Sequence, residues 1–300
     1  MYTTGMEDRV LARGYRFAGV HCGIRPDPDR LDLAMVVSDQ PASAGGVFTR
    51  NRVLAAPVRI CKERLPSAQA RGVVICSGNA NACTGQRGLD DARRMTDLAA
   101  QAIGCTPEQM LVCSTGVIGR HLPMPEIEAG IQTAAGQLVS GAAALERAAK
   151  AILTTDTHIK ISTRTLTLDG TEIRITGFGK GAAMIGPNMA TLLAFVMTDA
   201  AVAPADLQAL AARAAAHSFH CVSVEGHTST NDTLLLFANG QGSPLEGAPL
   251  APFEKAVTAV CTDLARAIAA DAEGATHLVT IQVEGLRNDR EAWQVAKVIA

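Results

Sequence analysis

The sequence predicts an α/β fold in which helices and strands build a layered α+β sandwich. Polar and apolar residues alternate through 163–178 on both sides of Asp169-Gly170, which predicts an antiparallel hairpin. Helical and strand-like segments are mixed along the chain, but they do not repeat as a regular βαβ series. This pattern favours α+β layers over a doubly wound parallel sheet.

The other predicted elements follow from local patterns. An apolar stripe predicts a helix at 89–103, and Thr106, Pro107 and Gln109 supply the cap and first turn of a short helix. Strands are predicted at 31–39, 72–77, 110–113 and 276–284, with a strand, a polar loop and a second strand at 221–240; further helices are predicted at 124–138, 141–153, 204–218, 253–270 and 289–300. The last helix has no stop signal before Ala300, so we expect a longer parent protein.

Composition bounds the class of protein. The 300 residues are 48% hydrophobic but only 3% aromatic, so a core built on Ala, Val, Leu and Ile is expected in one large domain or two. The formal charge is −2 without a dense Lys/Arg run, which argues against a nucleic-acid partner. The N-terminus has no apolar signal region, and no apolar run approaches a membrane span, so a cytoplasmic protein with no membrane partner is expected.

The cysteines and histidines predict no metal site. Eight Cys are scattered without a C-x-x-C pair, which indicates buried thiols in a reducing compartment. His217 and His220 have the spacing of two ligands on one helical face, but no third ligand stands at a convincing spacing.

Thr191 is the candidate nucleophile. Gly186-Pro187-Asn188 forms a turn that leads into the apolar run from Leu192, so Thr191 sits where a tight turn enters buried structure. Its hydroxyl can attack the carbonyl of Ala190, and hydrolysis of the resulting ester frees an α-amine whose pKa of about 7.7–8.0 suits a general base. On the residues alone, a helix N-cap is the more common role for such a threonine.

Five other residues are candidates for the site: Thr115, Gly116, Thr154, Lys180 and Glu273. Thr115 and Gly116 end a strand in a small turn that can donate to an oxyanion, or can simply cap the next element. Thr154 begins a polar TTDT segment that can line a pocket or can cap the next secondary-structure element. Lys180, in a glycine loop, can reach a carboxylate or can be solvated. The acids of the Asp271-Ala272-Glu273 segment follow a helix, where the dipole disfavours them; they can pair with a ligand ammonium or lie on the surface.

Taken together, six segments resemble the ornithine acetyltransferase family, also called bifunctional glutamate N-acetyltransferase, of arginine biosynthesis. They are SGNANACTGQRG (77–88), CSTGVIG (113–119), TTDT (154–157), GKGAAMIGPNMATLLAF (179–195), TSTNDT (228–233) and DAEGAT (271–276). They occur in the order of the family and cover nearly the whole chain. The chain departs from the usual pattern at Glu225, His227 and His158-Ile159, and it lacks the C-terminal segment of the family.

The resemblance implies a fold similar to, but distinct from, that of N-terminal-nucleophile hydrolases. It also implies self-cleavage between Ala190 and Thr191 into an α segment (1–190) and a β segment (191–300), which assemble as an α2β2 heterotetramer. Thr115 and Gly116 are then the oxyanion-hole residues, and Thr154, Lys180, Thr191 and Glu273 bind substrate.

The implied reaction moves an acetyl group from N2-acetylornithine to glutamate by a ping-pong mechanism through acetyl-Thr191. It needs no cofactor and no metal, and acetyl-CoA is a possible second donor. The alternatives are a related N-terminal-threonine amidohydrolase or aminopeptidase, a secondary-metabolite acetyltransferase, and an inactive truncated scaffold.

Overall fold

The computed structural model describes residues 10–168, 170–184, 192–240, 245, 247 and 249–300. Its strands form one mixed sheet of eight, in the order β4-β3-β2-β8-β7-β6-β5, with β1 paired to β2. The strands are β1 (Tyr15–Val20), β2 (Leu33–Phe48), β3 (Ser67–Asn79), β4 (Met110–Val117), β5 (Lys160–Leu168), β6 (Thr171–Lys180), β7 (Leu193–Thr198) and β8 (Thr233–Ala238).

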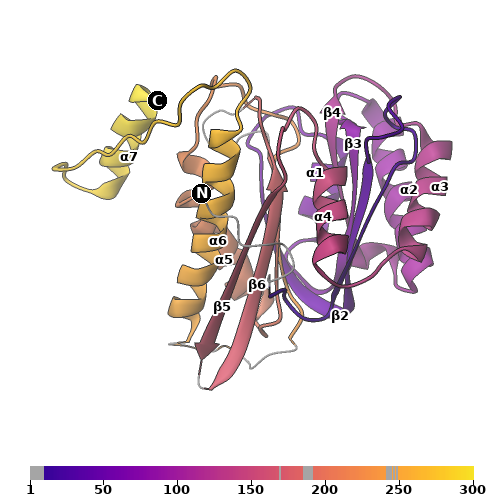
Figure 1. Ribbon diagram of the computed structural model, residues 1–300, viewed down its shortest axis with the longest axis horizontal. Helices are drawn as coiled ribbons and strands as arrows, with labels where there is room; N and C mark the ends of the chain where they lie inside the picture. Colours follow the sequence, from indigo (N-terminus) through magenta and orange to yellow (C-terminus); the bar gives the residue numbers. More distant parts are fainter. Residues whose placement is uncertain (1–9, 169, 185–191, 241–244, 246, 248) are drawn as a thin grey trace.

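Most helices cover the outer faces of this sheet, one packs between its two halves, and the last stands apart from it (Figure 1). They are α1 (Ala56–Arg64), α2 (Gly85–Ile103), α3 (Met124–Gly136), α4 (Ala142–Ala151), α5 (Pro204–Ala216), α6 (Leu250–Ala270) and α7 (Asp289–Ile299), with short 3-10 turns η2 (Pro107–Gln109) and η3 (Phe219–Cys221). Within the described residues, none of these helices combines the length and the apolar character that a membrane crossing requires.

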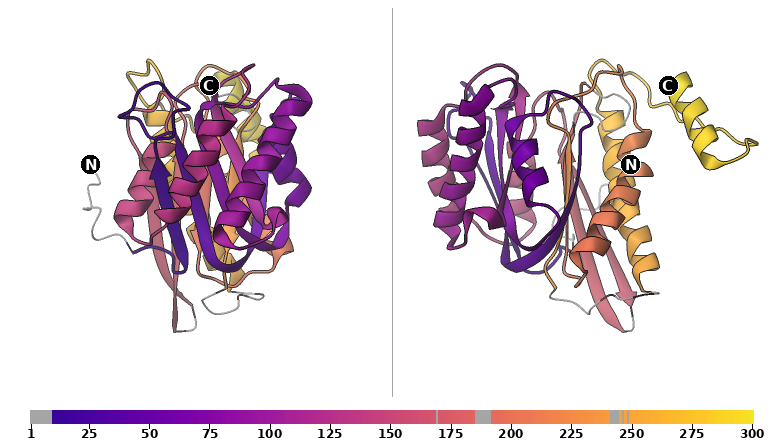
Figure 2. Two further views of the ribbon diagram at one scale, coloured as in Figure 1. Left: turned by 90° about the vertical axis from the view of Figure 1, so that its right-hand side faces the viewer. Right: turned by 180° about the vertical axis from the view of Figure 1, so that it is seen from behind.

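Three apolar clusters show how the layers pack. One cluster joins β2, β3 and β4 to α2 and α3, and another joins β6, β7 and β8 to α5 and α6. A third lies between the two halves of the sheet and includes the inner face of α4. Figure 2 shows the same order from behind, with the purple helices at one side and the orange helices at the other. The predicted layered α/β sandwich is therefore confirmed.

The long strand β2 joins the two halves. Its first part, Leu33–Val37, pairs with β3, and its last part, Ser43–Phe48, pairs with β8. The register shifts between Val37 and Ala42, and such irregularities bend a strand. Gly45 lies in the last part, where a Cβ atom would come within 2.9 Å of the Gln208 backbone, so glycine lets α5 pack closely against the sheet.

Most predicted elements are confirmed. The predicted strands at 31–39, 72–77 and 110–113 lie largely within β2, β3 and β4, and the predicted hairpin is the antiparallel pair β5–β6. The capped start at Thr106 is η2, where the Thr106 amide donates to Gln109 Oε1 at 3.0 Å.

Two predicted strands are wrong. The segment from residue 221 to 224 leaves η3 as an irregular loop, and 276–284 is irregular and largely exposed. The latter segment leads to α7, which buries none of its residues and stands apart from the sheet (Figures 1 and 2). An alternating pattern forms a strand only beside a partner strand, and 276–284 pairs with none in the described structure.

Candidate functional site

Three strand ends meet in one row of the sheet. Lys180, the last residue of β6, pairs with Leu193, the first residue of β7, and Leu193 pairs with Thr233, the first residue of β8. The Thr233 amide also donates to the carbonyl of Leu192 at 3.0 Å. The GKG motif, the start of the apolar run after Thr191 and the TSTNDT motif are therefore neighbours.

Asp156 organises the charges at this row. Its Oδ1 accepts from Lys160 Nζ at 2.8 Å and from the Gly181 amide at 2.6 Å, and its Oδ2 accepts from the Thr154 amide at 3.1 Å. Lys180 Nζ lies 3.7 Å from Oδ2, which is an ion-pair distance rather than a hydrogen bond. Asp156 thus joins the TTDT segment to the glycine loop. The order of the motifs in the sequence does not indicate this contact.

Lys180 contributes a buried ammonium group that forms an ion pair, but not a hydrogen bond, with Asp156. Only 2% of its surface is exposed, and its Nζ has no hydrogen-bond acceptor among the residues that the structure describes. Burial lowers the pKa of Lys180, while the charge of Asp156 raises it. Conversely, burial by itself would raise the pKa of Asp156, but Lys180, Lys160 and the Gly181 amide together hold it at about 2. A carboxylate entering beside Lys180 would supply the missing acceptor.

Asp271 and Glu273 have different surroundings. The Asp271 carboxylate accepts from Lys160 Nζ at 2.6 Å, from the Thr157 amide at 3.0 Å and from the Thr157 hydroxyl, so it completes the network instead of facing a ligand. Glu273 is exposed, and its amide donates to the carbonyl of Ala182 at 2.7 Å. This contact brings the DAEG turn beside the glycine loop that follows Lys180.

The turn of Thr115 and Gly116 is tied to the same strand ends by Asn231. The side-chain amide of Asn231 donates to the carbonyl of Ser114 at 2.8 Å and to that of Ala80 at 2.6 Å. Asn231 precedes Asp232 and the first residue of β8, so it connects three of the six motifs. No specific pattern in the sequence indicates this role, because an asparagine in a polar loop has many possible partners.

Gly116 has a backbone that other residues rarely adopt. Its φ is +134°, and a Cβ atom there would lie 2.3 Å from the carbonyl carbon of Gly78. Thr115 beside it is buried, whereas Gly116 is exposed. The exposed backbone of this turn can therefore meet a ligand, which is what an oxyanion hole requires.

Asp232 is a buried acid that the sequence analysis did not single out. Its side chain is fully buried, and neither carboxylate oxygen has a hydrogen bond of normal geometry within the described structure. Burial raises its pKa well above the usual range, against the opposing effects of the Ser229 hydroxyl and the Leu192 amide. A buried carboxyl group, whose charged form is disfavoured by burial, thus stands next to the start of β7.

The predicted nucleophile and cleavage site, Thr191 and Ala190, lie outside the described residues. Of the other predicted site residues, Lys180 and Thr154 meet at Asp156, Glu273 lies on the adjoining turn, and Thr115 and Gly116 are linked through Asn231. His217 caps the end of α5 and His220 lies in η3, so the predicted helical pair is not on one helix.

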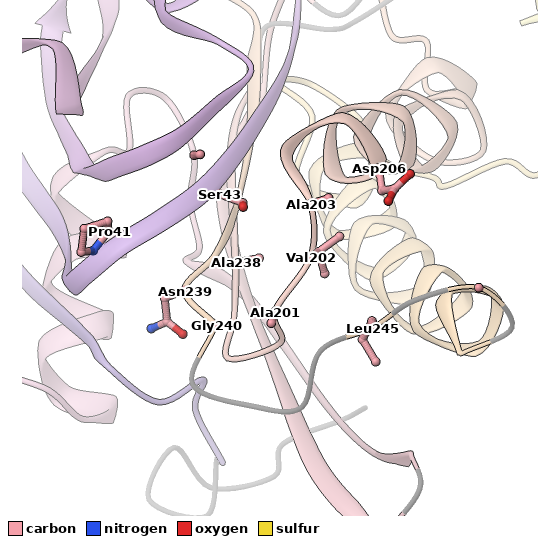
Figure 3. A pocket seen from close by; sticks show the side chains of 12 residues that line it. Pro41, Ser43, Ala201, Val202, Ala203, Asp206, Ala238, Asn239, Gly240 and Leu245 are labelled. Atoms are coloured by element: carbon pink, nitrogen blue, oxygen red, sulfur yellow. The ribbon is translucent and has the colours of Figure 1, made fainter.

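A separate pocket lies at the opposite ends of β7 and β8 (Figure 3). It has a volume of about 490 Å³, and Pro41, Asp206 and Asn239 are among its lining residues. None of the six motifs contributes to it. The candidate site is therefore defined by the converging motifs and not by this cavity.

The sequence is similar to known proteins of one family. Residues 16–300 match the ArgJ family. The arginine biosynthesis bifunctional protein ArgJ of Geobacter sulfurreducens is 48% identical over 96% of this chain and 74% of its own length. The protein of the same name from Rhodopirellula baltica is 42% identical over 97% of this chain and 72% of its own length.

Solved structures agree. An ornithine acetyltransferase from Mycobacterium tuberculosis, complexed with ornithine, has a TM-score of 0.53 and 34% identity over 61% of this chain and 94% of its own. An L-aminopeptidase D-Ala-esterase/amidase from Ochrobactrum anthropi, a variant of the Ntn hydrolase fold, has a TM-score of 0.56 over 88% of this chain and 87% of its own, but only 13% identity, so it shows the fold alone. The predicted family and the prediction of an enzyme are therefore confirmed: this chain belongs to the ArgJ family.

Proposed function

We propose that this protein transfers an acetyl group from N2-acetylornithine to glutamate through an acetyl-Thr191 intermediate, after cleaving itself between Ala190 and Thr191. The observation that carries the proposal is the buried ammonium of Lys180, which lies beside the first residue of β7 and, within the described residues, has an ion-pair partner in Asp156 but no hydrogen-bonded acceptor. Both substrates are amino acids with an α-carboxylate, and Lys180 offers that group a partner beside the start of β7.

Thr191 supplies the nucleophile and the base. Its hydroxyl attacks the Ala190 carbonyl, the peptide C–N bond breaks, and water then hydrolyses the ester to leave a free amine at Thr191. In turnover, that amine takes the hydroxyl proton while Oγ attacks the acetyl carbonyl, and ornithine leaves with a proton on its nitrogen. The amine of glutamate then attacks acetyl-Thr191, and the hydroxyl is restored.

The other site residues bind and stabilise. The turn of Thr115 and Gly116 supplies donors to the oxyanion that forms in each half-reaction, and Asn231 holds that turn against the start of β8. Glu273 is exposed on the neighbouring turn and pairs with a substrate ammonium. Thr154 lines the site beside Asp156.

The order of the strands supports a protein that stays assembled after the proposed cleavage. Strands β7 and β8 belong to the β segment (191–300), and they lie between β2 and β6 of the α segment (1–190). The cut segments would thus stay joined by two strand interfaces. The solved chain from Mycobacterium tuberculosis is about two thirds as long as this chain, which is the length expected of an α segment. We further propose assembly into an α2β2 heterotetramer in the cytoplasm.

No cofactor enters this mechanism, because each bond change uses only Thr191, the two substrates and water. Acetyl-CoA is a possible alternative donor, since its thioester presents the same acetyl carbonyl to Thr191. Neither nucleic acid nor membrane is required as a partner.

Intact-mass spectrometry tests the proposal. The wild-type chain should give two fragments that separate at Thr191, and the β fragment should gain one acetyl group with N2-acetylornithine. Thr191→Ala should stay in one piece, whereas Thr191→Ser, which keeps a hydroxyl, should still be cut. A wild-type protein that remains whole refutes self-processing.

Product analysis separates transfer from hydrolysis. With N2-acetylornithine and glutamate, N-acetylglutamate should accumulate, and it should be absent with Thr191→Ala. Free acetate as the sole product would instead assign the protein to the hydrolases that share its fold.

A further inference from the structure

We propose that Arg25 is a specificity residue that binds the side-chain carboxylate of the acceptor glutamate. This inference rests on the proposed function and deepens it. The two substrates share an α-carboxylate but differ at the other end, where ornithine is cationic and glutamate is anionic. One site must therefore offer a cation to the second substrate without repelling the first, and Lys180 alone cannot distinguish them.

Arg25 lies against the oxyanion turn. A Cβ atom on Gly78 would come within 2.9 Å of Arg25 Cγ and 3.3 Å of its Nε, so the side chain crosses directly over this glycine. Gly78 pairs in turn with Gly116 in the parallel ladder of β3 and β4. Because neither Gly78 nor Gly116 has a side chain, only their backbone lies between Arg25 and the oxyanion turn.

The guanidinium also reaches the second wall of the site. One of its terminal nitrogens donates to the carbonyl of Leu153, the residue before Thr154. Arg25 is half-buried, and this is its one side-chain hydrogen bond within the described structure. Since a guanidinium carries five N–H donors, a planar carboxylate can still be bound through two of them.

The charges around Arg25 are mixed. Burial and the charge of Arg30 lower its pKa, while Asp32, Asp156 and Asp27 raise it, and the Arg25 amide donates to Asp32 Oδ2 at 3.0 Å. Arg25 and Lys180 lie close enough for Arg25 to add to the effect of burial in lowering the pKa of Lys180. The two cations, Arg25 and Lys180, can each pair with one of the two carboxylates of glutamate. The ammonium end of ornithine would turn toward Glu273, the exposed acid on the adjoining turn.

Half-reactions separate this role from a structural one. Arg25→Gln should raise the KM for glutamate about tenfold to a hundredfold, the loss typical of a charged hydrogen-bonded pair. Acetylation of Thr191 by N2-acetylornithine, and exchange of its acetyl group into free ornithine, should change by less than about twofold, because neither uses a side-chain carboxylate. Arg25→Lys should retain part of the preference for glutamate over glutamine.

Arg30→Gln is the matched control. Arg30 donates to the carbonyl of Thr154 at 2.6 Å, so it anchors the same loop from an exposed position. Its loss should affect both half-reactions equally. Equal losses in both half-reactions for Arg25→Gln would overturn the inference and leave Arg25 as a second loop anchor.

Calorimetry gives a readout that does not depend on acetyl transfer. Wild-type protein should bind glutamate more tightly than glutamine, and Arg25→Gln should abolish that difference. Equal binding of the two ligands by the wild type overturns the Arg25 contact, whereas absence of an acetyl-Thr191 adduct with the preference intact overturns only the transfer reaction.

Discussion

Replacing Asp156 with asparagine tests whether one carboxylate holds the buried charge network together. The substitution keeps the size of the side chain but removes its charge. Lys180 then loses its ion-pair partner at 3.7 Å, and Lys160 keeps the Asp271 carboxylate at 2.6 Å and the His158 carbonyl at 3.2 Å. Both lysines are 2% exposed at the side chain, so water cannot replace the lost charge.

The loss of unfolding free energy has an expected size and an expected dependence on pH. Breaking a buried ion pair by removing one partner costs about 3–5 kcal/mol of unfolding free energy. The pH dependence follows from the pKa of Asp156, which is held at about 2 against a usual 3.8. Because the folded-state pKa is depressed, Asp156 stabilises the protein above the unfolded-state pKa, and this contribution of about 2 kcal/mol disappears as the pH falls through the folded-state value.

Urea unfolding measures both the size of the loss and its dependence on pH. At neutral pH, Asp156→Asn should be about 3–5 kcal/mol less stable than the wild type, and the difference should narrow by about 1 kcal/mol near pH 3. Asp263→Asn is the control, because Asp263 pairs with Arg164 at 2.5 Å where both side chains are more than 40% exposed. Such a pair contributes at most about 1 kcal/mol. Equal losses for the two variants, or no change with pH, would refute the proposed role of Asp156.

Three further substitutions test other parts of the structure. Gly116→Ala should destabilise the protein by about 2–5 kcal/mol in urea unfolding, since φ is +134° and the new Cβ meets backbone at 2.3 Å. Gly104→Ala is its control, because Gly104 has φ +74° and open space around it, and it should cost only about 1 kcal/mol. Equal losses for the two variants would contradict the steric argument. Asn231→Ala should lower stability by about 2–5 kcal/mol, because two carbonyls lose their donor, and a Tm unchanged in calorimetry would disprove the link. Phe195→Ala should cost about 3–5 kcal/mol, because this fully buried ring packs 5.1 Å from that of Phe178, and a loss below about 1 kcal/mol would show that the interior collapses around the gap.

Local patterns predicted what is decided locally. The hairpin of β5 and β6 follows from alternation around one Asp-Gly turn, and the helices follow from apolar stripes and caps. The same reasoning missed β1 and α1, which are short, and it placed a strand at 276–284 where none forms. A strand depends on a partner edge, and the sequence of one segment does not contain that edge.

For the site, the sequence by itself determined which residues can do chemistry. It supplied a threonine after a tight turn, a lysine in a glycine loop, an STG turn and the order of six family motifs. These residues are local features, and each can be recognised from its neighbours in the chain.

Only the tertiary structure decided which partners those residues have. Asp156 meets Lys180 because the loop before β5 comes to the end of β6, and Asn231 reaches Ser114 across 117 positions of sequence. Asp271 is likewise part of the network and Glu273 is not, although only Ala272 separates them in the sequence. Burial and charge pairing depend on contacts between distant segments, so they exist only once the sheet has formed.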